Sequence, residues 1–282
     1  MTLTWFPNGC ALNSKDVMSK FLVSANSRLG LDIQENNMDA DIAVIWSVLW
    51  NGRMASNQEV YNHFINSGKP VIVLDVGALK RNITWKIAVN HINAQGHYGH
   101  EDNLDLDRPQ KLGVALQTQQ TNNGKILIAG QHKKSLQLKD VDQEEWINNQ
   151  IRTIQQSSDR PIVVRPHPRS VLNGNRLVRT GVEFERPTKV AKSYDDFNID
   201  YNYYTVINYN SGPGIQAAIN GAQIVVDKTS LAYPVSNTIN NIENLTTFDR
   251  NDWFIKICHT EYTVDEIAKG VWCDRLAPAL NL

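Results

Sequence analysis

Residues 209–234 have the sequence YNSGPGIQAAINGAQIVVDKTSLAYP, and this stretch decides the fold. A turn of small residues leads into an apolar segment with helical spacing, and a run of β-branched residues follows directly. Gly214–Asn220 is therefore predicted as a helix and Gln223–Asp227 as a buried strand. Because Tyr203–Ile207 is also predicted as a strand, the stretch forms a strand–helix–strand unit, which is typical of a parallel sheet.

The same alternation of short apolar strands and amphipathic helices runs through the rest of the chain. It predicts parallel strands with helices on both faces of the sheet. The polar, turn-rich segment 97–125 interrupts the pattern, and 282 residues are enough for two domains. The expected strands are Thr2–Phe6, Ala43–Val48, Pro70–Asp75, Lys125–Ala129 and Pro161–Arg165, and the expected helices are Ser14–Arg28, Ser56–Asn66 and Glu144–Gln156.

We therefore expect an α/β fold with two facing Rossmann-like domains and a C-terminal helical segment. The expected limits are residues 1–120, 121–250 and 251–282. Ligands of such folds bind where the carboxyl ends of strands meet helix N-termini. In the last segment five apolar residues recur at roughly helical spacing, which predicts a pair of helices with a core-facing stripe: Trp253, Ile257, Ile267, Val271 and Trp272.

The composition is that of a soluble globular protein, with 41% hydrophobic and 20% charged residues. No run approaches the roughly 20 apolar residues of a membrane span, and no secretion signal is visible, so we expect a cytoplasmic protein. The three cysteines lack CxxC spacing, which argues against a disulfide framework and favours buried thiols. His91, His97 and His100 lack the spacing of a helical zinc pair, so we expect no metal site.

The net charge of −1 is unevenly distributed along the chain. Residues 125–192 carry 13 basic and 7 acidic side chains, a net charge of +6, whereas residues 193–282 carry 5 and 11, a net charge of −6. A basic surplus of this kind suits an anionic ligand, although a solvated basic face balanced by an acidic one is equally compatible with it.

The turn Ser211-Gly212-Pro213-Gly214 is shaped to receive an anion. Gly212 can take a positive φ, Pro213 suits the first position of a helix, and missing side chains let a ligand approach the backbone. The free N–H groups of a helix start would then point at a phosphate. An ordinary helix start is the alternative interpretation.

A second anion-binding feature is PIVVRPHPRS, residues 161–170. A buried strand is followed by Arg165, His167 and Arg169 at alternate positions, and the intervening prolines favour an extended chain. Extended geometry would place these three side chains on one side, where they form an oxyanion receptor. The alternative is a ladder of surface salt bridges.

A third strand end carries groups compatible with an anion. KILIAGQ, residues 125–131, ends in Gln131, and Lys133 follows shortly after it. Three such strand ends in one domain predict a diphosphate between them. In the first half the comparable feature is VIVLDVGALKRNITWK, residues 71–86, in which Asp75 ends a buried strand. Asp75 is either a general base toward an acceptor hydroxyl or the cap of the next helix.

The motifs IVVRPHPR and NYNSGPGIQAAINGAQIVVD resemble the C-terminal donor domain of GT-B type glycosyltransferases, especially capsule-type sugar transferases. This resemblance covers roughly residues 125–236. The segments VIVLDVGALKR and ITWKIAVNHIN resemble bacteriophage-encoded proteins of this kind, some of which transfer arabinose or glucose to hydroxymethylated pyrimidines of phage DNA. The first half otherwise resembles these enzymes only in organisation.

The resemblance implies a hexosyl or pentosyl transferase that needs no obligatory metal or other cofactor. An acceptor hydroxyl would displace the diphosphate of a nucleotide sugar, either UDP-arabinose or UDP-glucose, and cationic side chains would stabilise the leaving group. The residues implied in donor binding are Gln131, Lys133, Arg165, His167, Arg169, Ser211, Gly212, Gly214, Asp227 and Ser230. The assignment of Asp75 as the base follows from its position alone.

The acceptor implied by the narrower resemblance is 5-hydroxymethylcytosine in double-stranded phage DNA, modified in the host cytoplasm. The low overall basic charge argues against DNA, because duplex binding needs several phosphate-neutralising side chains. A carbohydrate acceptor, as in capsule synthesis, and a non-catalytic nucleotide- or sugar-binding protein are the alternatives. The first-half candidates for acceptor contact are Lys80, Arg81, Trp85 and His97.

Overall fold

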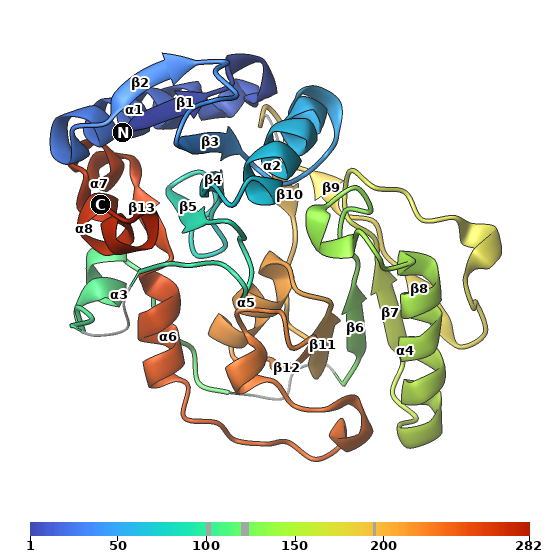
Figure 1. The fold of residues 1–282 in the computed structure, drawn as a ribbon. Helices are drawn as coiled ribbons and strands as arrows, with labels where there is room; N and C mark the ends of the chain where they lie inside the picture. Colours follow the sequence, from blue (N-terminus) through green and yellow to red (C-terminus); the bar gives the residue numbers. More distant parts are fainter. Residues whose placement is uncertain (100–102, 120–123, 194–195) are drawn as a thin grey trace. The chain divides into compact units, whose positions relative to one another are not determined.

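The computed structural model describes residues 1–99, 103–119, 124–193 and 196–282 (Figure 1). The chain divides into two compact units. Unit 1 consists of Met1–Val114 together with Ile255–Leu282, and unit 2 is Ala115–Phe254. The last residues of the chain therefore return to unit 1, whereas the limits predicted from the sequence gave residues 251–282 a segment of their own.

Unit 1 contains a six-stranded sheet in the order β13-β5-β4-β3-β1-β2. Strands β1 to β4 pair in parallel, as predicted, but β5 pairs antiparallel with both β4 and β13. The expectation of parallel pairing throughout is wrong here, because the turn between β4 and β5 is too short for a crossover helix. The strands are β1 (Thr2–Trp5), β2 (Asp32–Glu35), β3 (Ile42–Trp46), β4 (Val71–Val76), β5 (Thr84–Val89) and β13 (Glu261–Thr263).

Helices of unit 1 bury apolar faces against this sheet and against one another. Helix α1 places Phe21 in the core, where its ring stacks on Trp272 of α8 at a centroid distance of 4.3 Å. Stacking of two large buried rings supplies both apolar area and a fixed geometry. The helices are α1 (Lys15–Leu29), α2 (Asn57–Asn66), α3 (Arg108–Leu112), α7 (Val264–Lys269) and α8 (Val271–Leu276).

The C-terminal stretch differs from the predicted pair of helices. Helix α6 (Asn251–Cys258) is followed by strand β13 and then by α7 and α8. Four members of the predicted stripe are buried, but Val271 is 37% exposed because it opens α8 directly after the left-handed Gly270. The core role expected for Val271 is therefore wrong.

Unit 2 contains a five-stranded sheet in the order β12-β11-β6-β7-β8, and every neighbouring pair is parallel. A short antiparallel hairpin of β9 and β10 precedes β11 in sequence. The strands are β6 (Ile126–Ala129), β7 (Ile162–Arg165), β8 (Val182–Phe184), β9 (Thr188–Lys189), β10 (Phe197–Asn198), β11 (Thr205–Asn208) and β12 (Gln223–Val226).

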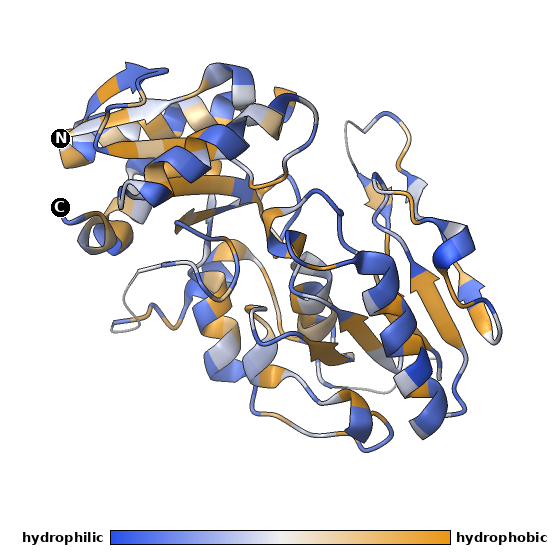
Figure 2. Ribbon diagram, turned by 45° about the vertical axis from the view of Figure 1, so that its right-hand side comes forward, coloured by the Kyte–Doolittle hydropathy of each residue, from blue (hydrophilic) through white to orange (hydrophobic). Residues whose placement is uncertain are grey.

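The core of unit 2 lies between this sheet and its helices, α4 (Gln143–Ser157) and α5 (Gly212–Ile219). In α4 the fully buried Ile147, Ile151 and Ile154 recur at helical spacing and pack against the strands. Figure 2 shows the hydrophobic colouring on the strands and the hydrophilic colouring on the outer side of α4. Because all five strands run in one direction, their carboxyl ends meet at one edge of the sheet.

The predicted chemistry of the cysteines is confirmed, since Cys10, Cys258 and Cys273 are free and buried. Over the part of the chain that the structure describes, no three histidine, cysteine or acidic side chains are arranged to hold a metal ion. His100 lies outside the described residues. Among the described helices, none combines the length and apolar character that crossing a bilayer requires.

Candidate functional site

The carboxyl edge of the unit 2 sheet brings together the segments that contain the ten predicted donor residues. Strands β12, β11, β6 and β7 are neighbours and run in parallel, so the loops that follow them are adjacent. Gln131 and Lys133 follow β6, and Arg165, His167 and Arg169 end or follow β7. The remaining residues follow β11 and β12: Ser211, Gly212, Gly214, Asp227 and Ser230.

Side-chain hydrogen bonds connect three of these loops. The amide of Gln131 donates to Asn210 Oδ1 at 3.0 Å, and Asn210 Nδ2 donates to Thr229 Oγ1 at 2.9 Å. Thr229 in turn donates from its hydroxyl to Asp227 Oδ1 at 2.6 Å. Gln131 and Asn210 are buried, so the chain of bonds fixes the loop after β6 against those after β11 and β12. Gln131 therefore shapes the edge by bonding within the protein.

The start of α5 has no side-chain cap. Ser211 has the extended backbone of an N-cap residue, but its hydroxyl bonds with the buried Asn208 and not with the first turn of the helix. Pro213 has no N–H group and the amide of Gly214 donates to Ser211 O at 3.2 Å, so the amide of Gly212 is the group that the first residues of α5 can offer to an anion. Gly212 is the first residue of α5 and does not have a positive φ, so that prediction is wrong. A helical φ suffices because the extended Ser211 already makes the turn.

Gly214 is required for packing. A Cβ atom at this position would lie 2.8 Å from Cγ1 of Val226 on β12. That distance is shorter than any ordinary carbon contact, so the helix can lie this close to the sheet only with glycine here. The absence of a side chain at Gly214 therefore sets where the start of α5 lies relative to β12.

Two histidines meet at the ends of β6 and β7. The rings of His132 and His167 contact edge to face at a centroid distance of 5.2 Å. Burial lowers the pKa of His132 to about 4, and the nearby charges of Arg169, Lys134 and Lys133 add to this. His132 is therefore neutral at pH 7, and the surroundings of its ring are dominated by cations. His132 was not among the donor-binding residues predicted from the sequence. Its position shortly after a core strand is the pattern that could have identified it.

The loop after β7 leaves the extended path that the prolines were expected to impose. The backbone turns at Pro168 and Arg169, and Ser170 N donates to His167 O at 3.0 Å. The amide of Arg169 also donates to Nδ1 of His167 at 3.1 Å. The expectation that the basic side chains alternate on one extended face is therefore wrong beyond His167.

Arg165 has partners inside the protein. Its side chain is 4% exposed and forms a salt bridge of 3.1 Å with Glu185. It also donates to Tyr203 Oη at 3.1 Å and to the carbonyl of Asp200 at 2.7 Å. Each bond joins the end of β7 to chain that lies before or after the β9–β10 hairpin. Arg165 thus holds the base of the loop that presents His167 and Arg169.

Asp227 and Ser230 follow β12, which is the last strand at one side of the sheet. Asp227 is half-buried and accepts hydrogen bonds from the amide and the hydroxyl of Thr229. Ser230 is fully buried, and its Oγ accepts from Ala232 N at 3.2 Å. Burial raises the pKa of Tyr209, and the charge of Asp227 adds to this, so the phenol and the carboxylate are close. Of these two predicted residues, Asp227 is the one with exposed surface.

In unit 1, Asp75 lies near the end of β4 and is half-buried. Ser47 donates from its hydroxyl to Asp75 Oδ2 at 3.1 Å, and the amide of Val76 donates to Oδ1 at 2.7 Å. Burial raises the pKa of Tyr98 well above its usual range, and the negative charges of Glu261 and Asp75 add to this. Asp75 does not cap a helix, because β4 runs on to Val76 and then turns into β5.

The predicted acceptor residues lie in different environments. Trp85 is 4% exposed on β5 and packs in the core, with its ring 5.5 Å from that of Trp46. Lys80 is half-buried and donates to the carbonyl of Leu112 at 3.3 Å, whereas Arg81 is exposed. His97 pairs through its backbone with the end of β5. The core position of Trp85 leaves its ring no surface for a base to stack on, which corrects the expectation of acceptor contact.

The turn after β4 binds a carboxylate of the protein itself. Glu261 is fully buried and accepts from Ala78 N at 2.6 Å, Leu79 N at 3.1 Å and Thr84 Oγ1 at 2.7 Å. A Cβ atom on Gly77 would lie 2.3 Å from Glu261 Oε2, so only glycine leaves room for this carboxylate. This site could not be predicted from the sequence, because Glu261 is 177 to 183 residues away from its partners.

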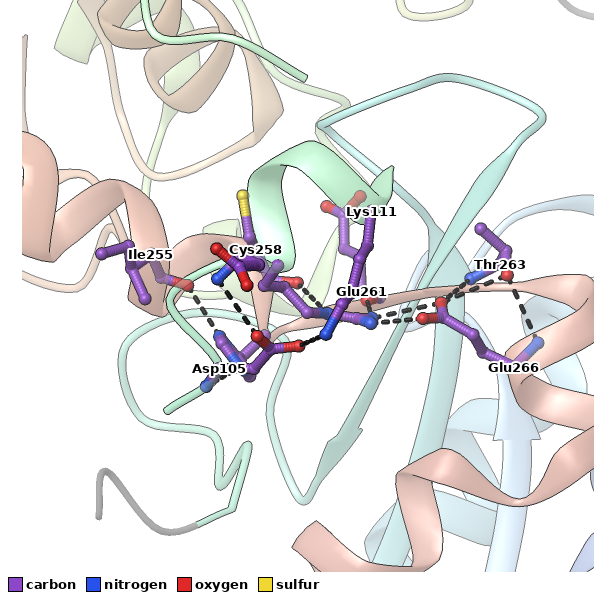
Figure 3. Close-up of polar contacts among 10 residues, drawn as sticks. Asp105, Lys111, Ile255, Cys258, Glu261, Thr263 and Glu266 are labelled. Atoms are coloured by element: carbon purple, nitrogen blue, oxygen red, sulfur yellow. Dashed lines mark hydrogen bonds and ion pairs between the residues drawn. The ribbon is translucent and has the colours of Figure 1, made fainter. Parts of the chain in front are cut away.

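A second buried network fixes α3 to the C-terminal stretch (Figure 3). The guanidinium of Arg108 donates to the carbonyls of Cys258 and Glu261, at 3.1 and 2.7 Å, and to the carboxylate of Glu266. Glu266 also completes the capping box of α7 with Thr263. Burial alone would raise the pKa of Glu266, but the bonds from Arg108 and Thr263 outweigh it, and the pKa is lowered.

Comparison with known proteins shows the fold. No protein-family model matches the sequence, and no curated protein matches it significantly. The KpsC β-Kdo 2,7 transferase of Thermosulfurimonas dismutans has a similar structure, with a TM-score of 0.52 and 11% identity over 96% of this chain and 99% of that one. The β-Kdo 2,4 transferase of the same organism's KpsC gives a TM-score of 0.47 and 10% identity over 96% and 98%.

A third structure, the UDP-GlcNAc 2-epimerase of Methanocaldococcus jannaschii, gives a TM-score of 0.30 and 12% identity over 100% of this chain and 99% of that one. At such low identities these likenesses concern the fold alone. The predicted fold class is confirmed as α/β with two Rossmann-like units of the GT-B type.

Proposed function

We propose that this protein is a glycosyltransferase that binds a nucleotide sugar at the carboxyl edge of unit 2. The observation that carries the proposal is the uncapped start of α5 beside a group of basic side chains at the ends of β6 and β7. Hydrogen bonds between Gln131 and Asn210 hold the end of β6 against the end of β11, which leads into α5, before any ligand arrives. The amide of Gly212 at the helix start and the nearby cations match a diphosphate.

The basic groups have distinct roles in the proposal. Lys133, Arg169 and the amide of Gly212 contact the diphosphate, and His167 contributes a ring nitrogen. Arg165 is a positioning residue, because its guanidinium is engaged with Glu185 and Tyr203. Asp227 binds a ribose or sugar hydroxyl, for which a half-buried carboxylate is a suitable acceptor. Together these groups stabilise the leaving diphosphate without an obligatory metal.

The transfer step needs a base toward the acceptor, and we assign it to Asp75. Its carboxylate takes the proton of the acceptor hydroxyl as the oxygen forms a bond to the anomeric carbon of the sugar. The bond from that carbon to the diphosphate oxygen breaks, and UDP leaves with the electron pair. Ser47 and the amide of Val76 orient Asp75 for this role.

The acceptor that we favour is 5-hydroxymethylcytosine in DNA, with UDP-arabinose or UDP-glucose as the donor. Support comes from the resemblance of the segments around β4 and β5 to phage-encoded proteins. Arg81 is an exposed cation of unit 1 that suits a DNA phosphate. Trp85 has no part in the proposal, because its ring lies in the core.

A carbohydrate hydroxyl is the second candidate acceptor. The structure with a TM-score of 0.52 is a sugar transferase, and the motifs of unit 2 resemble capsule-type enzymes equally well. A non-catalytic binding protein with the same anion site would bind the donor but release no UDP in the presence of any acceptor.

The deciding experiment is a transfer assay with labelled UDP-glucose, UDP-arabinose and related nucleotide sugars. The acceptors are duplex DNA with 5-hydroxymethylcytosine, unmodified duplex, the free nucleoside 5-hydroxymethyldeoxycytidine and neutral oligosaccharides. We expect label in hydroxymethylated DNA, also when EDTA is present. Label in oligosaccharide alone would show that the acceptor is a carbohydrate and not DNA. The absence of transfer to any acceptor would overturn the proposal that the protein is a glycosyltransferase.

The Asp75→Asn variant tests the base. The substitution keeps the shape and the bond from Ser47 but removes the proton acceptor. We expect the transfer rate to fall by about 10²–10⁴-fold while UDP affinity, measured by calorimetry, stays within about twofold. Asp39→Asn, at an exposed position of the same unit, is the control and should retain full activity. Full activity of Asp75→Asn would remove Asp75 from the mechanism.

A further inference from the structure

Within residues 179–192 of unit 2, the four cations have no carboxylate partner among the described residues: Arg179, Arg186, Lys189 and Lys192. All four are exposed. Other basic residues of this region are paired, because Arg165 binds Glu185, Arg176 binds Asp142 and Lys125 binds Glu183. Unpaired cations that lie close together in the chain produce a local positive potential.

These cations lie beside the proposed donor edge. Strand β8 is the edge strand of the sheet and runs parallel to β7, so its carboxyl end lies next to the loop that contains Arg169. The pairing continues one residue past β8, where Glu185 N donates to Val164 O at 3.0 Å. Arg186 therefore projects from the same edge, and the chain then enters β9, which contains Lys189.

Exposed apolar groups accompany the cations. Phe184 at the end of β8 is 41% exposed, and the guanidinium of Arg179 lies over its ring at 5.6 Å from the centroid. Arg186 is two residues further along, on the same face of the extended chain as Phe184. A planar ring flanked by guanidinium groups can contact sugar and base surfaces as well as phosphates.

We propose that this basic rim, formed by Arg179, Phe184, Arg186, Lys189 and Lys192, binds the phosphodiester backbone of the DNA acceptor. The inference rests on the proposed function, because it assigns the surface that holds the acceptor there. Because the net charge of the chain is −1, binding to a duplex requires a local concentration of cations such as this one. The rim also lies beside the donor edge, where the acceptor has to arrive.

The test measures how DNA binding depends on salt. The triple variant Arg186→Gln, Lys189→Gln and Lys192→Gln is compared with the wild type on a 30-base-pair duplex, by fluorescence anisotropy over a range of salt concentrations. Each phosphate contact contributes about 0.9 to the slope of log K against log salt, so we expect the slope to fall by about 2.7. The KM for DNA in the transfer assay should rise, while UDP affinity should not change.

A matched control removes three exposed cations elsewhere: Lys15→Gln, Arg152→Gln and Lys269→Gln. It changes the net charge by the same amount and should leave the slope almost unchanged. An unchanged slope in the rim variant, or binding of an acidic polysaccharide in place of DNA, would overturn the inference.

The two proposals fail in different ways. If the rim variant loses transfer to duplex DNA but still glycosylates the free nucleoside, both proposals are supported. If no acceptor is glycosylated, the proposed function fails, and the salt slope still decides whether the rim binds DNA. If rim and wild-type proteins modify DNA with equal KM and equal slope, only the inference about the rim fails.

Discussion

Two glycine-containing turns follow parallel strands in this protein, and they use their backbone N–H groups differently. After β4, the amides of Ala78 and Leu79 bind the buried carboxylate of Glu261. After β11, the start of α5 has no capping side chain, and the hydroxyl of Ser211 is bonded elsewhere. The first turn is saturated by the protein, whereas the second keeps its capacity for an anion.

The difference shows that glycine and exposed amides do not by themselves mark a ligand site. What distinguishes the two turns is whether the chain supplies its own counter-charge. Glu261 supplies it in unit 1, while the groups that shift the pKa of His132, near the second turn, include three cations and no carboxylate. An anionic ligand would complete the second turn as Glu261 completes the first.

The largest expected effect on stability comes from removing the carboxylate of Glu261, which the turn after β4 binds. Glu261→Ala removes three hydrogen bonds and leaves two amides without their acceptor. Buried donors left unsatisfied cost about 1–3 kcal/mol each, so we expect the free energy of unfolding of unit 1 to fall by about 3 kcal/mol. Urea unfolding followed by tryptophan fluorescence measures this.

Asp274→Ala is the control for that variant. Asp274 forms an ion pair with Arg28 in which both side chains are about half or more exposed, so its loss should change stability by less than about 0.5 kcal/mol. A loss below about 1 kcal/mol for Glu261→Ala would show that the turn after β4 does not depend on its carboxylate.

The second-largest expected effect is on UDP binding near the turn between β11 and α5. Arg169→Ala should weaken UDP binding about tenfold, because one charge-assisted contact to phosphate is lost from a partly solvated site. Calorimetric titration with UDP gives the dissociation constant. Arg152→Ala, on the exposed side of α4, removes the same charge away from the strand ends and should bind UDP as the wild type does. Equal affinities for the two variants would count against the site.

A smaller effect is expected from Gly214→Ala. The added methyl group would meet Val226, which costs about 1–3 kcal/mol, and about 1 kcal/mol of helix propensity offsets part of that loss. We expect a net loss of about 1 kcal/mol in unit 2 together with weaker UDP binding, as α5 shifts away from β12. Gln216→Ala on the same helix is the control. Unchanged UDP binding would show that Gly214 matters for packing but not for the binding site.

The smallest effect is a dependence on pH. The pKa of His132 is about 4 in the folded protein, below the ordinary value of 6.5, so protons favour the unfolded state. The stabilising contribution of neutral His132 is complete above pH 6.5 and is lost as the pH falls toward 4. The stability of His132→Asn should therefore decline less over that range. In an NMR titration, saturating UDP should raise the pKa of His132, and a value that stays near 4 would place the diphosphate elsewhere.

The sequence predicts the unit 2 sheet well and the unit 1 sheet only in part. Strands β6, β7 and β12 are short runs rich in β-branched residues, and their predicted ends are within one residue of those in the structure, whereas β8 was not predicted. Strand β5 was not predicted, because Lys86 at its centre interrupts an otherwise apolar run. In the structure Lys86 is buried. It lies in register between two acidic residues on the neighbouring strands, Asp75 on β4 and Glu261 on β13.

The candidate site divides in the same way. Local patterns located the loops after β6, β7, β11 and β12, because anion-binding groups there follow core strands directly. The partners of Arg165 could not be predicted, since Glu185 and Tyr203 are 20 and 38 residues away and no periodicity relates them. Burial of Trp85 depends on the pairing of β5 with β13, whose residues are 177 positions further along the chain.

The return of the chain to unit 1 has a consequence for synthesis on the ribosome. Strand β5 is flanked by β13, and Arg108 is held by carbonyls of Cys258 and Glu261, so unit 1 lacks an edge strand and a buried counter-ion until the last part of the chain emerges. Residues 115–254 are translated before that point and contain the whole unit 2 sheet. We therefore expect unit 2, whose sheet is translated in full first, to fold before unit 1, which needs residues 255–282 to be complete.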